Sequence, residues 1–196
     1  ESLSLTEARV PFSTLLSNLA SWDIHPPLYY VLLHGWVALA GASAPVLRLP
    51  SVLFGTACVP LLYLVGRRLV GPRAALLAAA LGAASPFWVG HSDEARMYPL
   101  YLFASLAALW ALLRAAERRD PGGWIAYGLI TGVSLYTHYF AILMIPVHLT
   151  YLLAIRAPRR VFYAWAAAGG MAALTFVPWL LFLASRRGGL SGIGSL

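Results

Sequence analysis

The sequence predicts an all-α, polytopic membrane helical bundle, and three observations support that prediction. Of the 196 residues, 60% are hydrophobic and only 11% are charged, whereas soluble domains carry about 25% charged residues. A soluble fold of this composition has too little polar surface to cover its core. The mean hydropathy is +0.74, and the apolar residues form long runs separated by arginine-bearing loops.

Six apolar runs are expected to be the spans of the bundle. They cover 46–66, 74–90, 99–113, 123–137, 139–155 and 161–184. A span needs about 20 residues, with about 17 as the lower end. We therefore expect 123–155 to be a tight hairpin of two short helices that turns at 137–139. Its first helix carries Gly128 and Gly132 as a GxxxG pair, which predicts close helix packing.

The region before the spans is expected to be an extracytoplasmic loop, residues 1–45, ahead of a membrane domain over 46–196 that is truncated at both ends. Within the loop, leucines and a phenylalanine recur at helical spacing over 10–20, which predicts an amphipathic helix in the membrane interface. The alternative is an ordinary helix packed on a soluble domain. The apolar run 27–41 is expected to be a half-depth or in-plane helix, because a span here would separate the acidic residues.

The charges then fix the orientation. All 14 basic residues are arginine, so chemistry that needs a P-loop or Schiff-base lysine is excluded. Nine of them fall in three loops that six spans place on one side: Arg67, Arg68, Arg73, Arg114, Arg118, Arg119, Arg156, Arg159 and Arg160. The positive-inside rule makes that side cytoplasmic. The net charge of +7 therefore reflects topology, and we expect no nucleic-acid partner.

Two polar residues inside the apolar runs are expected to be structural. Cys58 is the only cysteine, so it forms no intrachain disulfide, and we interpret it as a small core residue. His148 is interpreted as a hydrogen-bonded core histidine. Because the chain begins at Glu1 without a methionine, we expect it to be an internal piece of a longer protein.

The first polar cluster with chemical potential is Asp23-Ile-His25-Pro26-Pro27. The two prolines start a helix, which places Asp23 and His25 at its N-terminal end. Helix N-termini favour anions, so a phosphate near His25 fits this pattern. A helix entry capped by Asp23 is the alternative.

The second cluster is Ser92-Asp93-Glu94-Ala95-Arg96-Met97-Tyr98-Pro99, at the opening of the 99–113 run. Two acids and an arginine at a membrane boundary cost free energy unless they are solvated or take part in binding or catalysis. Arg96 can pair with Glu94 or bind a lipid phosphate, and a solvated loop with a local ion pair is the alternative. Arg48, at the start of the 46–66 run, can snorkel or contact phosphate. His138 at the hairpin tip is a weaker candidate.

At these clusters the chain resembles the family 39 glycosyltransferases of the GT-C superfamily, the bacterial relatives of protein mannosyltransferases and of the lipid A aminoarabinose transferase. Four stretches carry the resemblance: 23–36, 47–55, 92–98 and 135–140. It implies a GT-C membrane fold and transfer of a sugar, with inversion, from a polyprenyl-phosphate donor. The acceptor would be a lipid, glycan or protein on the extracytoplasmic face of the bacterial cytoplasmic membrane, among membrane lipids.

The resemblance also implies roles for particular residues. In the family an Asp-Glu pair precedes an interfacial helix, and the Asp is the expected general base. Glu1 matches the Glu of that pair, so the Asp would be the residue before Glu1. This piece alone is therefore expected to be inactive. Where the aminoarabinose transferase has Asp-Pro, this chain has Tyr98-Pro99, and we expect Glu94 to take over part of that role. The expected catalytic acids are thus Glu1, Glu94 and Asp23.

The remaining site residues follow from the chemistry of the leaving group. Departing polyprenyl phosphate gains negative charge, so Arg96, Arg48, His25 and His138 are the expected phosphate-binding residues. Tyr98, Tyr29 and Asp93 are expected in the substrate pocket. A divalent metal held by Glu and His side chains is compatible with the family, but no spacing here specifies one. A polyprenyl-lipid or small-solute transporter, and a structural membrane subunit, are the alternative functions.

Overall fold

The computed structural model describes residues 6, 9–21, 25–118 and 120–190, and in this part of the chain every regular element is a helix. The elements are α2 (Phe12–Ser21), α3 (Leu28–Ala40), α4 (Ala44–Leu69), α5 (Pro72–Ala83), α6 (Pro86–Ser92), α7 (Tyr98–Arg118), α8 (Pro121–Thr137), the 3₁₀ helix η1 (Tyr139–Leu143), α9 (Met144–Ala154) and α10 (Arg159–Leu190). The predicted all-α class is confirmed.

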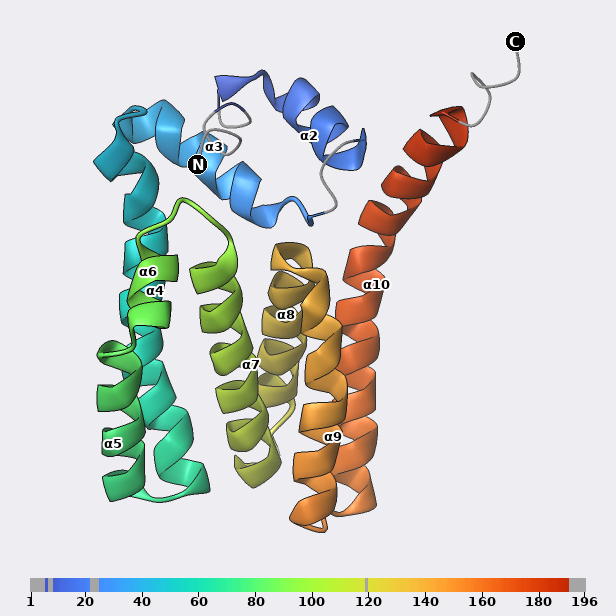
Figure 1. Ribbon diagram of the computed structural model, residues 1–196. Helices are drawn as coiled ribbons and strands as arrows, with labels where there is room; N and C mark the ends of the chain where they lie inside the picture. Colours follow the sequence, from blue (N-terminus) through green and yellow to red (C-terminus); the bar gives the residue numbers. More distant parts are fainter. Residues whose placement is uncertain (1–5, 7–8, 22–24, 119, 191–196) are drawn as a thin grey trace.

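The long helices run side by side, and α2 and α3 lie across one end of the bundle (Figure 1). We call this the cap end; it also holds the loop between α6 and α7 and the tip between α8 and η1. The turns α4–α5, α7–α8 and α9–α10 lie at the opposite end. Because these turns carry the arginine clusters of the sequence, we call it the arginine end.

The spans differ in length from the expected set of six. Among the described residues, α4, α7 and the Arg159–Ser185 part of α10 are long and apolar enough to cross a membrane. The pair α5 and α6 makes a fourth candidate, although it bends by 58°. Helix α8 has 17 residues, the lower limit for a span, and η1 with α9 forms a short apolar segment of the hairpin.

The bend between α5 and α6 divides the predicted span over 74–90 into two helices. Pro86 lacks an N–H group and holds the preceding residue in an extended conformation, and Ser85 has φ −71° and ψ 118°. The Ser85 hydroxyl accepts a hydrogen bond from the Trp88 backbone at 3.4 Å, so it caps the new helix. As a result α6 turns out of line with α5, next to the start of α7 (Figure 1).

The hairpin and the GxxxG packing are confirmed. Helix α8 ends at Thr137, and His138 is extended before η1 begins. A Cβ atom on Gly128 would lie 2.8 Å from the Ala168 carbonyl oxygen of α10, so only glycine allows this approach. Cys58 and His148 are both buried, at 0% and 1% exposure, and the His148 ring bonds the Tyr127 hydroxyl at 2.9 Å, as expected of core residues.

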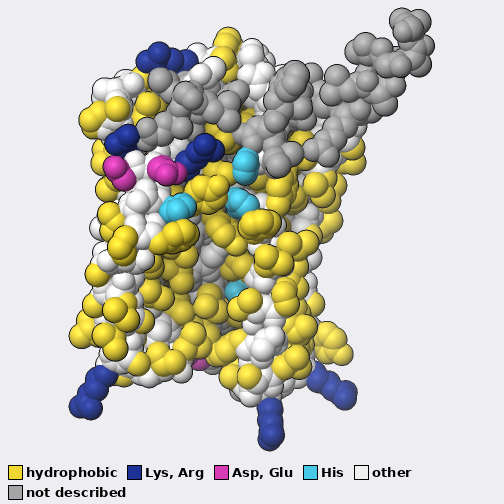
Figure 2. Space-filling model, viewed as in Figure 1, with side chains coloured by type: hydrophobic (Ala, Val, Ile, Leu, Met, Phe, Trp, Pro, Cys, Tyr) yellow, Lys and Arg dark blue, Asp and Glu magenta, His cyan; other side chains and the backbone are white. Residues whose placement is uncertain are grey.

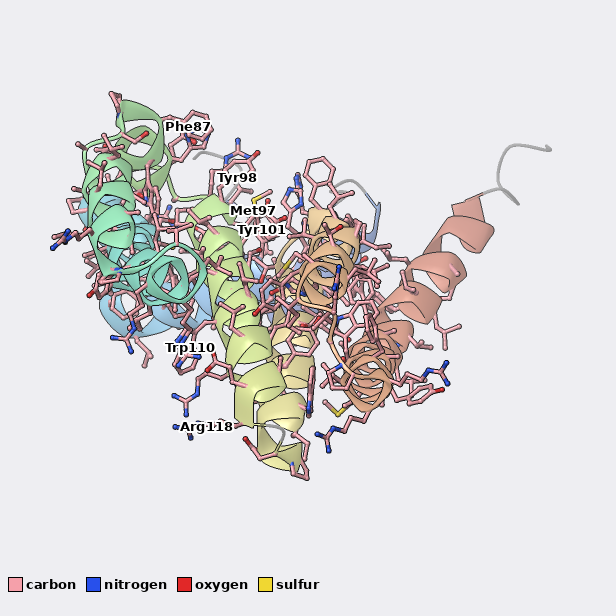
Figure 3. All side chains as sticks on the ribbon, turned by 90° about the horizontal axis from the view of Figure 1, so that it is seen from below. Phe87, Met97, Tyr98, Tyr101, Trp110 and Arg118 are labelled. Atoms are coloured by element: carbon pink, nitrogen blue, oxygen red, sulfur yellow. The ribbon has the colours of Figure 1, made fainter. Side chains whose placement is uncertain are left out.

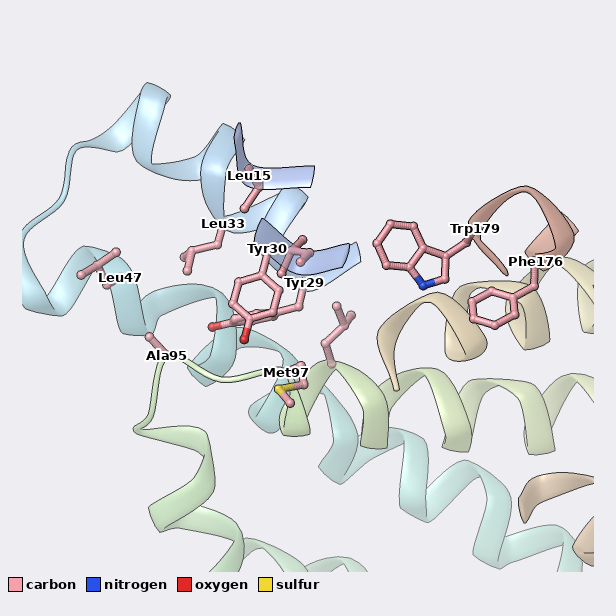
Figure 4. Packing of buried hydrophobic residues seen from close by; sticks show 11 residues of the cluster. Leu15, Tyr29, Tyr30, Leu33, Leu47, Ala95, Met97, Phe176 and Trp179 are labelled. Carbon is pink, nitrogen blue, oxygen red and sulfur yellow. The ribbon is translucent and has the colours of Figure 1, made fainter. Parts of the chain in front are cut away.

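A core of apolar and aromatic side chains holds α2 and α3 on the bundle (Figure 4). Leu15 and Leu19 of α2 are fully buried, in one cluster with Tyr30 of α3 and Trp179 of α10. Helix α2 therefore turns these leucines toward the protein, and its predicted place in the membrane interface stays a prediction. Helix α3 lies across the end of the bundle (Figure 1).

Candidate active site

Charged and imidazole side chains gather near the cap end on a face that is otherwise apolar (Figure 2). They come from the start of α4, from the end of α6, from the loop between α6 and α7, from the segment before α3 and from the hairpin tip. Charges placed at the mouths of apolar helices are costly unless they meet water or a ligand. The gathering therefore marks the candidate site.

A polar hollow of about 500 Å³ is lined by Arg48, Gly90, Asp93, Glu94 and Arg96, and we call it the arginine hollow. Two of these side chains are joined by an ion pair of 3.5 Å between Arg48 Nη1 and Asp93 Oδ2. Their side chains are 38% and 67% exposed, so the pair contributes little to stability.

Two linked hydrogen bonds hold the backbone at Arg96. The Ser51 hydroxyl of α4 donates to the Arg96 carbonyl oxygen at 3.1 Å. Because that donation uses the only hydroxyl hydrogen of Ser51, the Tyr29 hydroxyl is the donor in the 3.1 Å bond between the two side chains. Tyr29 is 2% exposed and does not line the arginine hollow, so in this structure it supports the loop that carries Arg96.

His138 lies among aromatic rings at the hairpin tip. Its ring centroid is 5.2 Å from that of Tyr101, 5.7 Å from that of His25 and 6.2 Å from that of Tyr98. Its Nδ1 accepts a hydrogen bond from the Phe140 backbone at 3.1 Å, so the proton of the neutral ring is on Nε2. Burial lowers the pKa of His138, and the nearby His25 lowers it further. His138 is thus a neutral N–H donor at pH 7.

A second hollow of about 540 Å³ lies between α6 and α7, and we call it the aromatic hollow. Its lining residues are Ser85, Phe87, Trp88, His91, Ser92, Tyr98, Pro99, Tyr101 and Leu102. Figure 3 shows Phe87 of α6 and Tyr98 and Tyr101 of α7 on the same side of the bundle. Tyr98 is the sequence-predicted residue in this hollow. The sequence reasoning did not include His91, because only the bend at Ser85 brings α6 over α7.

The arginine hollow and the aromatic hollow both include residues of α6, although their linings have no residue in common. A third hollow of about 510 Å³ shares Gly90 and Asp93 with the arginine hollow, and Trp88 and Ser92 with the aromatic hollow. A charged environment and an aromatic environment therefore both occur along α6.

Comparison with known proteins identifies the family of this chain. Residues 24–182 match the family model described as dolichyl-phosphate-mannose-protein mannosyltransferase. The chain belongs to this mannosyltransferase family.

Two curated relatives are similar to this member of the mannosyltransferase family. Both are undecaprenyl phosphate-alpha-4-amino-4-deoxy-L-arabinose arabinosyl transferases, from Pseudomonas aeruginosa and Pseudomonas paraeruginosa. Each is 35% identical over 157 aligned positions, which cover 76% of this chain and 29% of the relative. The chain thus spans less than a third of these relatives. No solved structure is significantly similar to it.

The sequence-predicted residues of this mannosyltransferase-family chain separate into three groups. Arg48, Asp93, Glu94 and Arg96 meet in the arginine hollow. His25, His138 and Tyr98 lie together beside it. Glu1 and Asp23 lie outside the described residues. Within the described ranges, no three His, Cys, Asp or Glu side chains are grouped so that they could hold a metal ion.

Proposed function

We propose that this protein is an inverting glycosyltransferase that moves a sugar from a polyprenyl-phosphate carrier to an acceptor on the extracytoplasmic face of the bacterial cytoplasmic membrane. The observation that carries the proposal is the arginine hollow, in which two guanidinium groups and two carboxylates meet at the mouths of apolar helices. Family membership supports transfer over transport or a structural role. The names of the relatives support an undecaprenyl-phosphate-linked sugar as donor.

In the proposed donor complex, Arg48 and Arg96 bind the phosphate. Guanidinium groups suit this task because they stay charged and present paired N–H donors to phosphate oxygens. His138 adds a neutral N–H donor, and His25, in contact with its ring, adds a second imidazole. The polyprenyl chain attached to the phosphate then lies among membrane lipids, against the apolar surface next to the site.

In the proposed reaction a carboxylate takes the proton of an acceptor hydroxyl, and the hydroxyl oxygen forms a bond to the anomeric carbon of the sugar. The bond from that carbon to the phosphate oxygen breaks, and polyprenyl phosphate leaves with the electron pair. Glu94 is exposed at the hollow and is our candidate for this carboxylate. Asp23 and Glu1 remain candidates from the sequence alone.

The remaining residues hold substrate in place. Asp93 lines the hollow as the partner of Arg48, and Tyr98 is 38% exposed at the edge of the aromatic hollow. Tyr29 acts through Ser51 on Arg96, so we assign it a positioning role. The acceptor is a lipid, glycan or protein that presents a hydroxyl group.

The test is transfer of a labelled sugar by the full-length protein in membranes, with two donors: undecaprenyl-phosphate 4-amino-4-deoxy-L-arabinose and polyprenyl-phosphate mannose. We expect Glu94→Gln to lower kcat about 10²-fold, the lower end of the range for a general base. Arg96→Ala should raise KM for the donor about tenfold or more, as loss of a charged hydrogen bond does.

The controls are Glu117→Gln and Arg68→Ala. These two residues form an ion pair of 2.7 Å between α4 and α7, toward the arginine end of both helices, so they match the tested residue types away from the site. Both variants should keep the wild-type transfer rate. Wild-type rates in both Glu94→Gln and Arg96→Ala would refute the site, and absence of transfer from either donor by the wild type would refute the function.

A further inference from the structure

His91 is a histidine whose proton position is fixed by its own helix. Its Nδ1 lies 2.9 Å from the Phe87 carbonyl oxygen. A carbonyl oxygen only accepts hydrogen bonds, so Nδ1 carries the proton and Nε2 of the neutral ring carries a lone pair. No hydrogen bond from another described residue reaches Nε2. His91 therefore offers one hydrogen-bond acceptor at the wall of the aromatic hollow.

The surroundings of this acceptor are flat and aromatic. The His91 ring centroid is 4.2 Å from that of Phe87 and 5.5 Å from that of Tyr98, and Trp88 and Tyr101 complete the wall. Pockets of this kind, apolar and aromatic with a few fixed polar groups, orient small ligands. A sugar ring fits this wall because its C–H face is apolar and its edge carries hydroxyl groups that donate hydrogen bonds.

A second histidine near Tyr98 has the opposite hydrogen-bonding role to His91. His138 also contacts the Tyr98 ring, but its Nδ1 accepts from the backbone, so its Nε2 donates. Tyr98 is thus in ring contact with one imidazole that accepts a hydrogen bond and with one that donates. A sugar hydroxyl can donate a hydrogen bond to one of these imidazoles and accept one from the other, whereas an apolar chain can do neither.

We propose that His91 is a positioning residue that accepts a hydrogen bond from a hydroxyl group of the donor's sugar ring, seated in the aromatic hollow. The inference rests on the proposed function, since it places the sugar of that donor. A third hollow shares lining residues with the arginine hollow and with the aromatic hollow, and along this series we place the phosphate in the arginine hollow and its attached ring in the aromatic hollow. The polyprenyl chain has no hydroxyl groups and gains nothing from this acceptor.

The experiment measures binding of two probes to the full-length protein in nanodiscs. The probes are undecaprenyl phosphate alone and the tighter-binding of the two sugar donors above. His91→Phe removes the acceptor but keeps a ring, and His91→Gln restores an acceptor oxygen. His34→Phe is the matched control, because His34 contacts Phe12 near the cap end and does not line the aromatic hollow.

We expect His91→Phe to weaken binding of the sugar donor about 2- to 12-fold, as loss of one neutral hydrogen bond does, and to leave undecaprenyl phosphate unaffected. His91→Gln should recover most of the loss, and His34→Phe should bind like the wild type. In transfer assays the His91→Phe effect should fall mainly on KM.

Two results would overturn the inference while the proposed function stands: unchanged donor binding in His91→Phe, or equal weakening of both probes. Unfolding temperatures of all three variants show whether a loss of binding is a loss of fold. If the wild type binds neither the phosphate nor the sugar donors, the proposed function itself fails.

Discussion

The hydrogen-bonding state of single histidines decides what this site can do at neutral pH. The backbone N–H of Phe140 points at His138 Nδ1, and a proton on that nitrogen would put two donors face to face. Burial and the nearby His25 act in the same direction, since both lower the pKa of His138. The residue is therefore suited to donate from Nε2 and poorly suited to act as a cation.

This arrangement predicts a pH-dependent stability. The pKa of His138 is lowered from its ordinary value by folding, so the neutral ring contributes stability that is fully present above about pH 6.5 and is lost as pH falls through the lower folded-state pKa. The unfolding temperature of the full-length protein should fall between pH 7 and pH 5. His25→Gln removes the like charge and should make this fall smaller.

The control for that measurement is His34→Gln, which changes a histidine outside this cluster and should keep the wild-type profile. An equally steep fall in His25→Gln and in the wild type would contradict the coupling between His25 and His138. Scanning fluorimetry at several pH values is sufficient for this comparison.

The sequence was sufficient to predict which charges lie on one face, but not which of them pair or which polar residues support them. Arg48 and Asp93 are 45 residues apart, and topology predicts only that both lie on the side opposite the arginine loops. Tyr29 was expected to touch substrate. Its place beneath the site depends on the rotation of α3 about its axis, which the prolines before the helix do not determine.

At the scale of elements, the close approach of α6 to α4 shapes both hollows. A Cβ atom on Gly55 of α4 would collide with the Ser92 side chain of α6, and the Trp88 indole donates to the Gly55 carbonyl oxygen at 3.2 Å. Trp88 and Ser92 both line the aromatic hollow. The close spacing of α4 and α6 thus depends on the absence of a side chain at Gly55.

Gly55→Ala should therefore destabilise the protein by about 1–3 kcal/mol, the usual cost of overpacking, and weaken donor binding because α6 is displaced. Gly35 of α3 is the matched control, since a Cβ atom there would meet nothing within 4 Å. Gly35→Ala should stabilise the helix by up to about 1 kcal/mol. Unfolding free energies of opposite sign are expected, and a neutral Gly55→Ala would contradict the packing.

The sequence predicted the span over 74–90 but not the break between α5 and α6, because hydropathy alone does not reveal the backbone preferences of Ser85 and Pro86. The run 74–90 is apolar throughout, which favours one span. Ser85-Pro86 nonetheless combines a good N-cap residue with the residue that best starts a helix, and it was the available signal. His91 was missed for the same reason, since it lines the aromatic hollow only because the chain bends there.

At the scale of the whole molecule, the ends of the bundle differ in charge, and this difference predicts its orientation. Among the described residues, Asp93 and Glu94 lie at the cap end, while nine of the 14 arginines of the sequence fall in the three loops of the opposite side. Arginine-rich loops stay in the cytoplasm. The cap end is then expected outside.

Cysteine labelling in intact cells checks this orientation. A membrane-impermeant thiol reagent should modify Asp93→Cys directly and Arg118→Cys only after the cells are permeabilised. The native Cys58 is 0% exposed, so the background should be low. The reverse labelling pattern would place the site in the cytoplasm and contradict the proposed function.

Near the site, helix α4 is joined to the loop before α7 by the 3.1 Å hydrogen bond from the Ser51 hydroxyl to the Arg96 carbonyl oxygen. We expect this bond to hold in place the two arginines that we assign to the phosphate, a group that all polyprenyl-phosphate donors share. Helix α6 is a seven-residue segment beside this frame. If the proposed function holds, changes in residues 85–92 should therefore alter which sugar is bound, and intact α4 and α7 helices should keep the binding of the polyprenyl-phosphate carrier.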